Sequence, residues 1–257
     1  MEIIIISLAA FLVAILTFFS GFGLGTILTP VFMIFFPVDL AIALTGVVHF
    51  FNNVFKLFLV GRFADKAVVF RFGLPAVIAA FLGSWLLLQM TGLPPWFSYN
   101  AFGKHFEVYP MKFIISVLLI FFACMDLLPS LKNIQFNKDK LPLGGALSGF
   151  FGGLSGNQGA LRSAFLIRAG LSKEAFVATA VVVSTFVDLT RLGVYATRFS
   201  RAGLIDNITL VLCATVAGIA GSFLGNKLLK KITFQSLQVI VAVMLIIISI
   251  GLGAGLI

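Results

Sequence analysis

The sequence predicts an all-α, polytopic helical membrane protein made of two four-segment repeats, each beginning with a glycine-broken helix or hairpin. Composition is the first reason: 60% of the 257 residues are hydrophobic, 11% are charged and the mean hydropathy is +1.14, whereas soluble domains are about 45–50% apolar and about 25% charged. The second reason is that the apolar residues form long runs of the roughly 20 residues that a helix needs to cross a bilayer. The third is that the same order of features occurs twice along the chain.

The charge distribution supports this class. The chain has 18 Lys and Arg against 9 Asp and Glu, and the cations lie in short connectors between apolar runs, as membrane orientation requires. A nucleic-acid partner is therefore not predicted. Cys124 and Cys213 lie inside apolar runs with no metal-type spacing and are interpreted as small core hydrophobes.

The first transmembrane repeat is predicted over residues 1–128. Its opening apolar run, 3–36, is too long for one span and is broken by the glycine-rich segment 20–25 and again by Pro30. Unbroken spans are predicted at about 39–60, 72–90 and 111–128. The connector before the last of these carries aromatic residues that suit the membrane–water interface.

A polar connector, 129–141, precedes the second transmembrane repeat, 142–257. This repeat also opens with an interrupted run, broken by the glycine-rich segment 152–159. Its unbroken spans are predicted at about 174–197, 206–229 and 236–257. The tripeptide Ser-Gly-Phe occurs in both opening runs, and the repeated order of features indicates an internal duplication.

The relative orientation of the repeats depends on the broken segments. If each crosses the membrane once, the repeats are parallel, and Lys and Arg divide weakly between the two sides. If each is a hairpin, the repeats are inverted, and the division is stronger. The positive-inside rule favours the stronger asymmetry, so inverted repeats with both termini outside are favoured, and parallel repeats stay open.

The glycine-rich breaks are the first candidate site. Unpaired backbone at membrane depth survives only where it is buried in protein or faces a watery cavity, and a half-helix beginning there presents N–H groups that suit an anion. Arg162 adds a fixed charge that suits oxyanions. The predicted substrate-binding residues here are Gly23, Gly25, Thr26, Gly153, Ser155, Gly156, Asn157, Gln158 and Arg162. The alternative is that the glycines only permit close helix packing.

A second candidate set lies on the spans that follow the breaks. His49, Asn52, Asn53 and Lys56 fall on one helical face, and a shift of 135 residues aligns that face with Ser184, Asp188 and Arg191. These faces would form the polar wall of a substrate path. Asn52, Asn53 and Arg191 would then bind substrate, while His49 or Asp188 would take up a proton during coupling.

A structural interpretation of the same faces stays open. Lys56 and Arg191 would extend to the surface, Asp188 would neutralise Arg191, and His49 would make a packed hydrogen bond. The sequence has no H-E-x-x-H, G-x-S-x-G, P-loop or paired-cysteine signature. We therefore expect no enzyme activity, no cofactor and no metal.

The arrangement resembles a known family. Residues 21–30, followed by the turn at Pro37 and the Asn52-Asn53 span, resemble the first repeat of the sulfite exporter TauE/SafE family, and 149–156 with 170–175 resemble its second. The resemblance covers about 10–250. It implies an integral membrane permease for small sulfur-containing anions, often moved outward, with the central site between the breaks.

The breaks depart from the family pattern. The family usually has three consecutive glycines at each break, whereas this chain has Gly-Leu-Gly at 23–25 and Gly-Asn-Gln-Gly at 156–159. The polar insertion favours a larger or more hydrogen-bonding anion than sulfite.

The residues and the resemblance together predict a membrane transporter, with export favoured, for sulfite, an organosulfonate or a related anion. The prediction includes coupling to the proton gradient and location in the bacterial inner (plasma) membrane. The partners would be the small anion and the lipid bilayer, while formation of a homo-oligomer stays open. The alternative is a membrane scaffold or assembly factor without a transported substrate.

Overall fold

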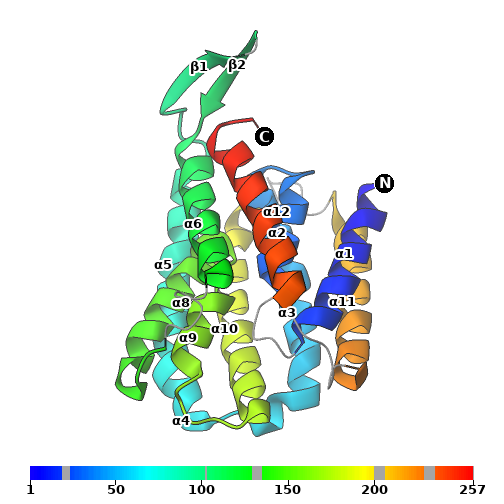
Figure 1. Ribbon diagram of the computed structural model, residues 1–257, viewed down its shortest axis with the longest axis vertical. Coiled ribbons are helices and arrows are strands. Elements are labelled where there is room, and N and C mark those ends of the chain that lie inside the picture. Colours follow the sequence, from blue (N-terminus) through cyan, green and yellow to red (C-terminus); the bar gives the residue numbers. More distant parts are fainter. Residues whose placement is uncertain (19–23, 102, 129–134, 200–205, 229–234, 257) are drawn as a thin grey trace.

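The computed structural model describes residues 1–18, 24–101, 103–128, 135–199, 206–228 and 235–256, which are mostly helical (Figure 1). The earlier elements are α1 (Glu2–Thr17), α2 (Leu24–Met33), α3 (Val38–Val60), η1 (Gly61–Phe63), α4 (Lys66–Val68), the π-helical η2 (Val69–Gly73), α5 (Leu74–Met90), β1 (Phe97–Ala101), β2 (Lys104–Val108) and α6 (Pro110–Leu127). The later elements are η3 (Lys138–Lys140), α8 (Leu141–Ser155), α9 (Gly159–Leu166), α10 (Lys173–Phe199), α11 (Ile208–Leu228) and α12 (Gln235–Gly253).

Several of these helices are suited to a bilayer. Four stretches are long and apolar enough to cross it, namely Val38–Phe63, Lys66–Met90, Lys173–Ala196 and Ile208–Lys227, and shorter apolar helices accompany them. Large apolar side chains point outward, with Phe58 85% exposed and Ile247 65% exposed. Extensive apolar exposure is expected of a surface that faces lipid rather than water. The predicted polytopic helical membrane class is confirmed.

Helices α3 and α10, which follow the two broken segments, run in opposite directions. In Figure 1, α3 descends from blue to cyan, whereas α10 ascends from green to yellow. The start of α8 and the end of α9 lie at the same end of the molecule, because Phe136 N–H donates to Ala164 O at 3.2 Å. The second broken segment is therefore a hairpin. These directions are compatible with inverted repeats, and the repeat boundaries stay a prediction.

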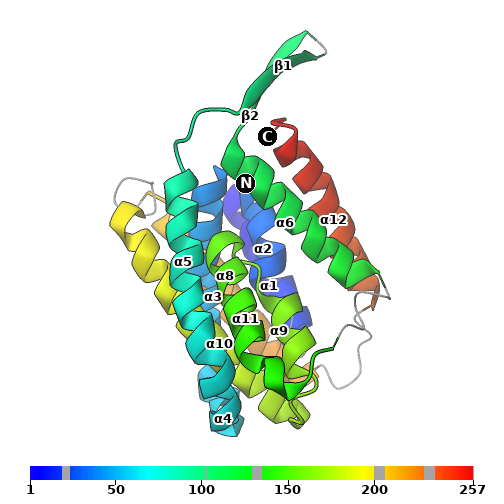
Figure 2. The same ribbon diagram turned by 90° about the vertical axis from the view of Figure 1, so that its left-hand side faces the viewer.

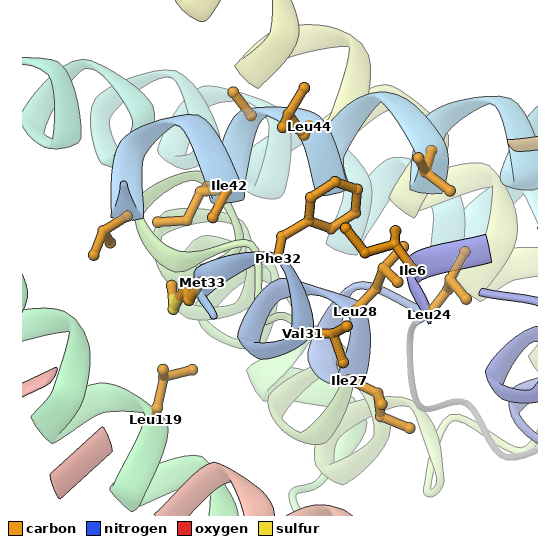
Figure 3. Packing of buried hydrophobic residues seen from close by; sticks show 14 of the residues in the cluster. Ile6, Leu24, Ile27, Leu28, Val31, Phe32, Met33, Ile42, Leu44 and Leu119 are labelled. Atoms are coloured by element: carbon orange, nitrogen blue, oxygen red, sulfur yellow. The ribbon is translucent and has the colours of Figure 1, made fainter. Parts of the chain in front are cut away.

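Helix α2 differs from expectation at Pro30. The sequence analysis placed a break there, but α2 continues from Leu24 to Met33 with Pro30 inside it. A proline removes one helical hydrogen bond and can be tolerated where neighbouring helices support the chain. All ten residues of α2 are buried, and Figure 3 shows Phe32 and Leu28 packed against residues of α1 and α3.

The second break is shorter than predicted. Helix α8 continues through Gly152 and Gly153 to Ser155, so only residues 156–158 interrupt the helical segment. Gly156 has φ 76° and ends α8 in the left-handed conformation, which glycine adopts without the penalty that a β-carbon brings.

The opening helix of each half packs on a late helix of the other half, α1 on α11 and α8 on α5. Small residues allow the close approach. A β-carbon on Gly149 would collide with the carbonyl oxygen of Ala76 on α5, and one on Gly221 would collide with that of Phe11 on α1. This is the small-residue packing expected between membrane helices.

The connector between α5 and α6 contains a β-hairpin that the sequence analysis did not predict. Strands β1 and β2 are antiparallel, with Phe97 opposite Val108, and the hairpin projects beyond the helices (Figure 2). Tyr99 and Phe106 stack with their ring centroids 5.4 Å apart. The Tyr99 hydroxyl donates to Ala254 O at 2.6 Å, which ties the hairpin to the C-terminal segment.

Candidate functional site

The two broken segments meet in the interior of the helical bundle. A β-carbon on Gly25 would lie 3.1 Å from the carbonyl oxygen of Gly156, so the two segments approach closely and leave little room for a side chain at Gly25. Thr26 Oγ1 donates to Asn157 Oδ1 at 2.8 Å. The predicted site residue Gly23 lies outside the described residues. The described parts of both breaks are therefore neighbours, although they are far apart in sequence.

Next to this contact, Asp188 joins the two halves through a buried network. His49 Nδ1 lies 2.7 Å from Asp188 Oδ2, and Asn53 Nδ2 donates to the same oxygen at 3.0 Å. Arg191 Nη2 and Nε lie 2.8 and 3.0 Å from Asp188 Oδ1. Both oxygens of the carboxylate are thus satisfied, as a buried charge requires.

The network connects residues that the 135-residue shift aligns. Asn53 on α3 and Asp188 on α10 are equivalent under that shift, and their side chains bond directly. Residues related by a pseudo-two-fold axis meet only near that axis. The contact is therefore the one expected at the interface of two inverted repeats.

A cavity lies on one side of the network. It is small, with a volume of about 30 Å³, which is room for water and lies well below the range of about 300–1,000 Å³ for small-molecule pockets. Its polar lining comes from Thr17, His49, Asn53, Lys56, Arg162 and Ser184. Phe18, Val177, Ala180 and Val181 complete the wall. In Figure 1, these residues come from the lower ends of α1 and α3, the residue just after α1, the short α9, and the lower half of α10.

The wall of the cavity is positively charged. Lys56 is 5% exposed and Arg162 is 4% exposed, and no carboxylate lines the cavity in the part of the chain that the structure describes. Arg162 Nη1 donates to Ser184 Oγ. Lys56 Nζ lies 5.3 Å from the centroid of the Phe18 ring, a favourable cation–π distance. Two cations are thus held at membrane depth facing a common space.

The break region also contains polar atoms available to a guest or to water. Among the described residues, hydrogen-bond partners are absent for Asn157 Nδ2, both amide atoms of Gln158, Thr29 Oγ1 and Thr45 Oγ1, all of them buried. Buried polar atoms are almost always satisfied in folded proteins. Water or a bound guest would satisfy these atoms, so substrate binding at the break stays a prediction.

The predicted site residues divide into two groups. His49, Asn53 and Arg162 line the cavity. The remaining described ones do not line it: Gly25, Thr26, Asn52, Gly153, Ser155, Gly156, Asn157, Gln158, Asp188 and Arg191.

Some of the second group have structural partners of their own. Gly153 is helical, and a β-carbon there would collide with the carbonyl oxygen of Ala80, so this glycine permits close packing. Ser155 Oγ donates to Phe151 O at 2.9 Å. Asn52 Oδ1 accepts from Ser222 Oγ at 2.7 Å.

Two cavity residues were absent from the predicted site list although they lie on the predicted polar faces. Lys56 does not reach the surface, so the snorkelling interpretation is wrong for this residue. Ser184 accepts the hydrogen bond from Arg162. The helical spacing of His49, Asn53 and Lys56 was the available signal. The apolar part of the wall, formed by Val177, Ala180 and Val181, could not be predicted, because nothing in its sequence distinguishes it from an ordinary buried helix face.

The comparisons with known proteins agree with this membrane architecture. The profile of the family described as "Sulfite exporter TauE/SafE" matches residues 6–252, nearly the whole chain. No curated protein and no solved structure matches the chain.

Proposed function

Because the chain belongs to the sulfite exporter TauE/SafE family, whose members are integral multi-pass membrane transporters rather than enzymes, we propose that it exports a small sulfur-containing anion across the bacterial inner membrane. The proposed substrates are sulfite and organosulfonates. The observation that carries the proposal is the cavity wall, which contains the buried basic side chains of Lys56 and Arg162 and is lined by no described carboxylate.

The physical argument starts from the cost of buried charge. Inserting a basic side chain at membrane depth costs at least about 2.5–3.5 kcal/mol on insertion scales. A partner of opposite charge lowers this free-energy cost. Asp188 already pairs with Arg191. An anion in the cavity would be attracted by the positive charges of Lys56 and Arg162. The guanidinium group also presents several N–H donors in a fixed geometry that suits an oxyanion. The site is therefore suited to an anion.

Substitution of Arg162 tests the proposal. Arg162→Gln should lower sulfite flux into proteoliposomes by about 10–100-fold, the equivalent of losing a hydrogen bond to a charged group. Asn157→Ala should lower it less, because Asn157 does not line the cavity. Arg168→Gln is the matched control, since Arg168 is exposed and bonds to Gln135. The proposal is wrong if both site variants fold and bind and transport sulfite like the unmodified protein.

Proton coupling is a separate part of the proposal. The His49–Asp188 contact links the two halves beside the cavity, so gain or loss of a proton there would change the charge that the anion meets. His49→Gln keeps a hydrogen-bonding side chain but cannot titrate near neutral pH. We expect its flux to lose the response to an imposed pH gradient.

The other histidine in the sequence supplies the control for coupling. His105 is exposed in the hairpin, and His105→Gln should leave the response to the gradient intact. Flux of the unmodified protein that ignores the gradient would remove the proton role. Absence of any flux, together with a stable protein partner on purification, would instead favour an assembly factor.

A further inference from the structure

We infer that the protein has a second small-anion site, closed in this structure, on the opposite side of the Asp188 network from the cavity. We call this site the upper vestibule, and its wall is formed by Ile42, Thr45, Gly46 and Arg191. The inference rests on the proposed function and names the site that the anion occupies on the far side of the network. It depends on a correspondence between the two halves and on the contacts of the corresponding residues.

The first step is the correspondence between α3 and α10. The 135-residue shift that relates Asn53 to Asp188 also applies to the wall of the cavity. The α10 residues of its apolar part are Val177, Ala180 and Val181. Their counterparts near the start of α3 are, in the same order, Ile42, Thr45 and Gly46. If the two halves exchange conformations, these α3 residues would line a space like the cavity.

The shift also gives a counterpart to the basic residue that α3 contributes to the cavity wall. Lys56 corresponds to Arg191. Helix α3 descends and α10 ascends in Figure 1, so Lys56 lies below the Asp188 network and Arg191 lies above it. The same set of positions therefore occurs once on each side of the network, as in transporters whose inverted repeats open alternately to the two sides of the membrane.

The second step is that the structure brings these counterparts together. A β-carbon on Gly46 would lie 3.3 Å from Arg191 Cζ. One on Gly156 would lie 2.9 Å from Arg191 Nη1 and 3.9 Å from Ile42 Cγ2. Ile42, Thr45 and Arg191 are 0% exposed. The upper vestibule is therefore closed in the state that has the cavity on the other side of the network.

The third step is that the closed surface contains polar atoms suited to an anion. Thr45 Oγ1 and Thr29 Oγ1 are buried and have no hydrogen-bond partner among the described residues. The position that a β-carbon on Gly156 would occupy is 3.4 Å from Thr29 Oγ1 and 2.9 Å from Arg191 Nη1. Hydroxyl and guanidinium groups donate hydrogen bonds to oxyanions. Arg191 is paired with Asp188, so hydrogen-bond donors rather than an excess of charge would hold the anion there.

Cysteine accessibility tests the opening of the upper vestibule. In protein with Cys124→Ser and Cys213→Ser, Thr45→Cys should react with a membrane-impermeant methanethiosulfonate reagent added on the side of the membrane that bears the hairpin. Ala180→Cys, in the cavity wall, should react from the opposite side. Ala43→Cys is the matched control, because Ala43 is buried in the apolar core on the same helix as Thr45, and it should not react from either side.

The same assay tests the anion class. Methanesulfonate, which does not react with thiols, should slow the reaction of Thr45→Cys at least about threefold when it is added on the hairpin side at a saturating concentration. Sodium chloride at the same ionic strength is the control and should leave the rate unchanged.

Substitution of Gly46 tests the contact that keeps the upper vestibule closed. Gly46→Val would press on Leu192 as well as on Arg191, because a β-carbon there would lie 3.2 Å from Leu192 Cδ2. Overpacking of the closed form should raise the reaction rate of Thr45→Cys at least about fivefold. Gly193→Val is the control on α10, since a β-carbon at Gly193 would meet nothing within 4 Å, and it should leave the rate unchanged.

The outcomes separate this inference from the proposed function. Sulfite flux by the unmodified protein, with folded Thr45→Cys that does not react from the hairpin side, would overturn the upper vestibule and leave the transport function intact. Reaction that methanesulfonate does not slow would overturn its assignment as an anion site. Absence of both sulfite and methanesulfonate flux would overturn the proposed function, whereas reaction of Thr45→Cys and its slowing by methanesulfonate would still support the second site.

Discussion

Asp188 shows how single residues determine the chemistry of the protein's interior. Its carboxylate binds a histidine, an amide and a guanidinium from two different helices, and each partner satisfies an atom that would otherwise be costly to bury. The polar residues of the two breaks follow the same principle, since Thr26 and Asn157 bond across the halves. The interior is thus polar where the two halves meet and apolar around that contact.

Gly156 permits a residue-scale prediction. Its φ of 76° is unfavourable for a residue with a β-carbon, and a β-carbon would also lie 2.9 Å from Arg191 Nη1. Gly156→Ala should therefore destabilise the protein by about 1–2 kcal/mol from the backbone conformation alone, with a further cost from displacing Arg191. Thermal unfolding in detergent measures the loss.

Gly92 provides the control for that substitution. It also has positive φ, at 84°, but a β-carbon there would contact nothing within 4 Å. Gly92→Ala should show only the backbone cost. Equal losses of stability for the two variants would mean that Arg191 moves away at no cost in free energy and that the packing at the break is loose.

At the scale of elements, the glycines of α8 have two different roles. Gly145, Gly149 and Gly153 recur every four residues and face the carbonyl oxygens of Phe72 on η2 and of Ala76 and Ala80 on α5. This spacing places them on one side of the helix, where they bring the two backbones together. Gly156 alone among these four ends the helix. The sequence analysis assigned Gly153 to the break because composition does not separate a packing glycine from a helix-ending one.

Gly149 permits a prediction at this scale. Gly149→Ala should force α8 away from α5 and lower the thermal unfolding midpoint, with a cost of about 1–3 kcal/mol, as for other overpacked sites. Gly193→Ala is the control within a helix, because a β-carbon at Gly193 would meet nothing within 4 Å. It should be neutral or should stabilise α10 by up to about 1 kcal/mol. An unchanged midpoint for Gly149→Ala would contradict the observed packing.

For the whole molecule, the positions of the basic connectors indicate the orientation in the membrane. The lower end in Figure 1 carries the connectors after α3 and after α9, which contain Arg62, Lys66, Arg71, Arg168 and Lys173. The hairpin and the described termini lie at the upper end. From the positive-inside rule we predict that the lower end faces the cytoplasm. The cavity, lined from the lower ends of α1 and α3, would face the same side.

Cysteine labelling in intact cells tests this orientation. In a background with Cys124→Ser and Cys213→Ser, a membrane-impermeant maleimide should label Ser98→Cys in the hairpin without disruption of the cells. Ala67→Cys, in the basic connector, should react only after disruption. Both positions are exposed, so a difference would report sidedness. The reverse pattern would show that the protein has the opposite orientation.

Much of the fold was predictable because membrane insertion constrains local sequence strongly. Helix class, the approximate spans and the second broken segment follow from runs of apolar residues and from glycines within them. The hairpin at 97–108 was missed because a short connector carries little periodic signal. Pro30 was interpreted as a break because its effect depends on whether neighbouring helices support the chain.

The sequence by itself determined the membrane class and the polar faces that contain His49 and Asp188, because each depends on local composition or helical period. Only the tertiary structure decided that Asp188 is neutralised within the protein while Lys56 and Arg162 face one cavity. Charge pairing depends on distances between helices far apart in the chain, and a helical pattern shows which face is polar but not what that face meets.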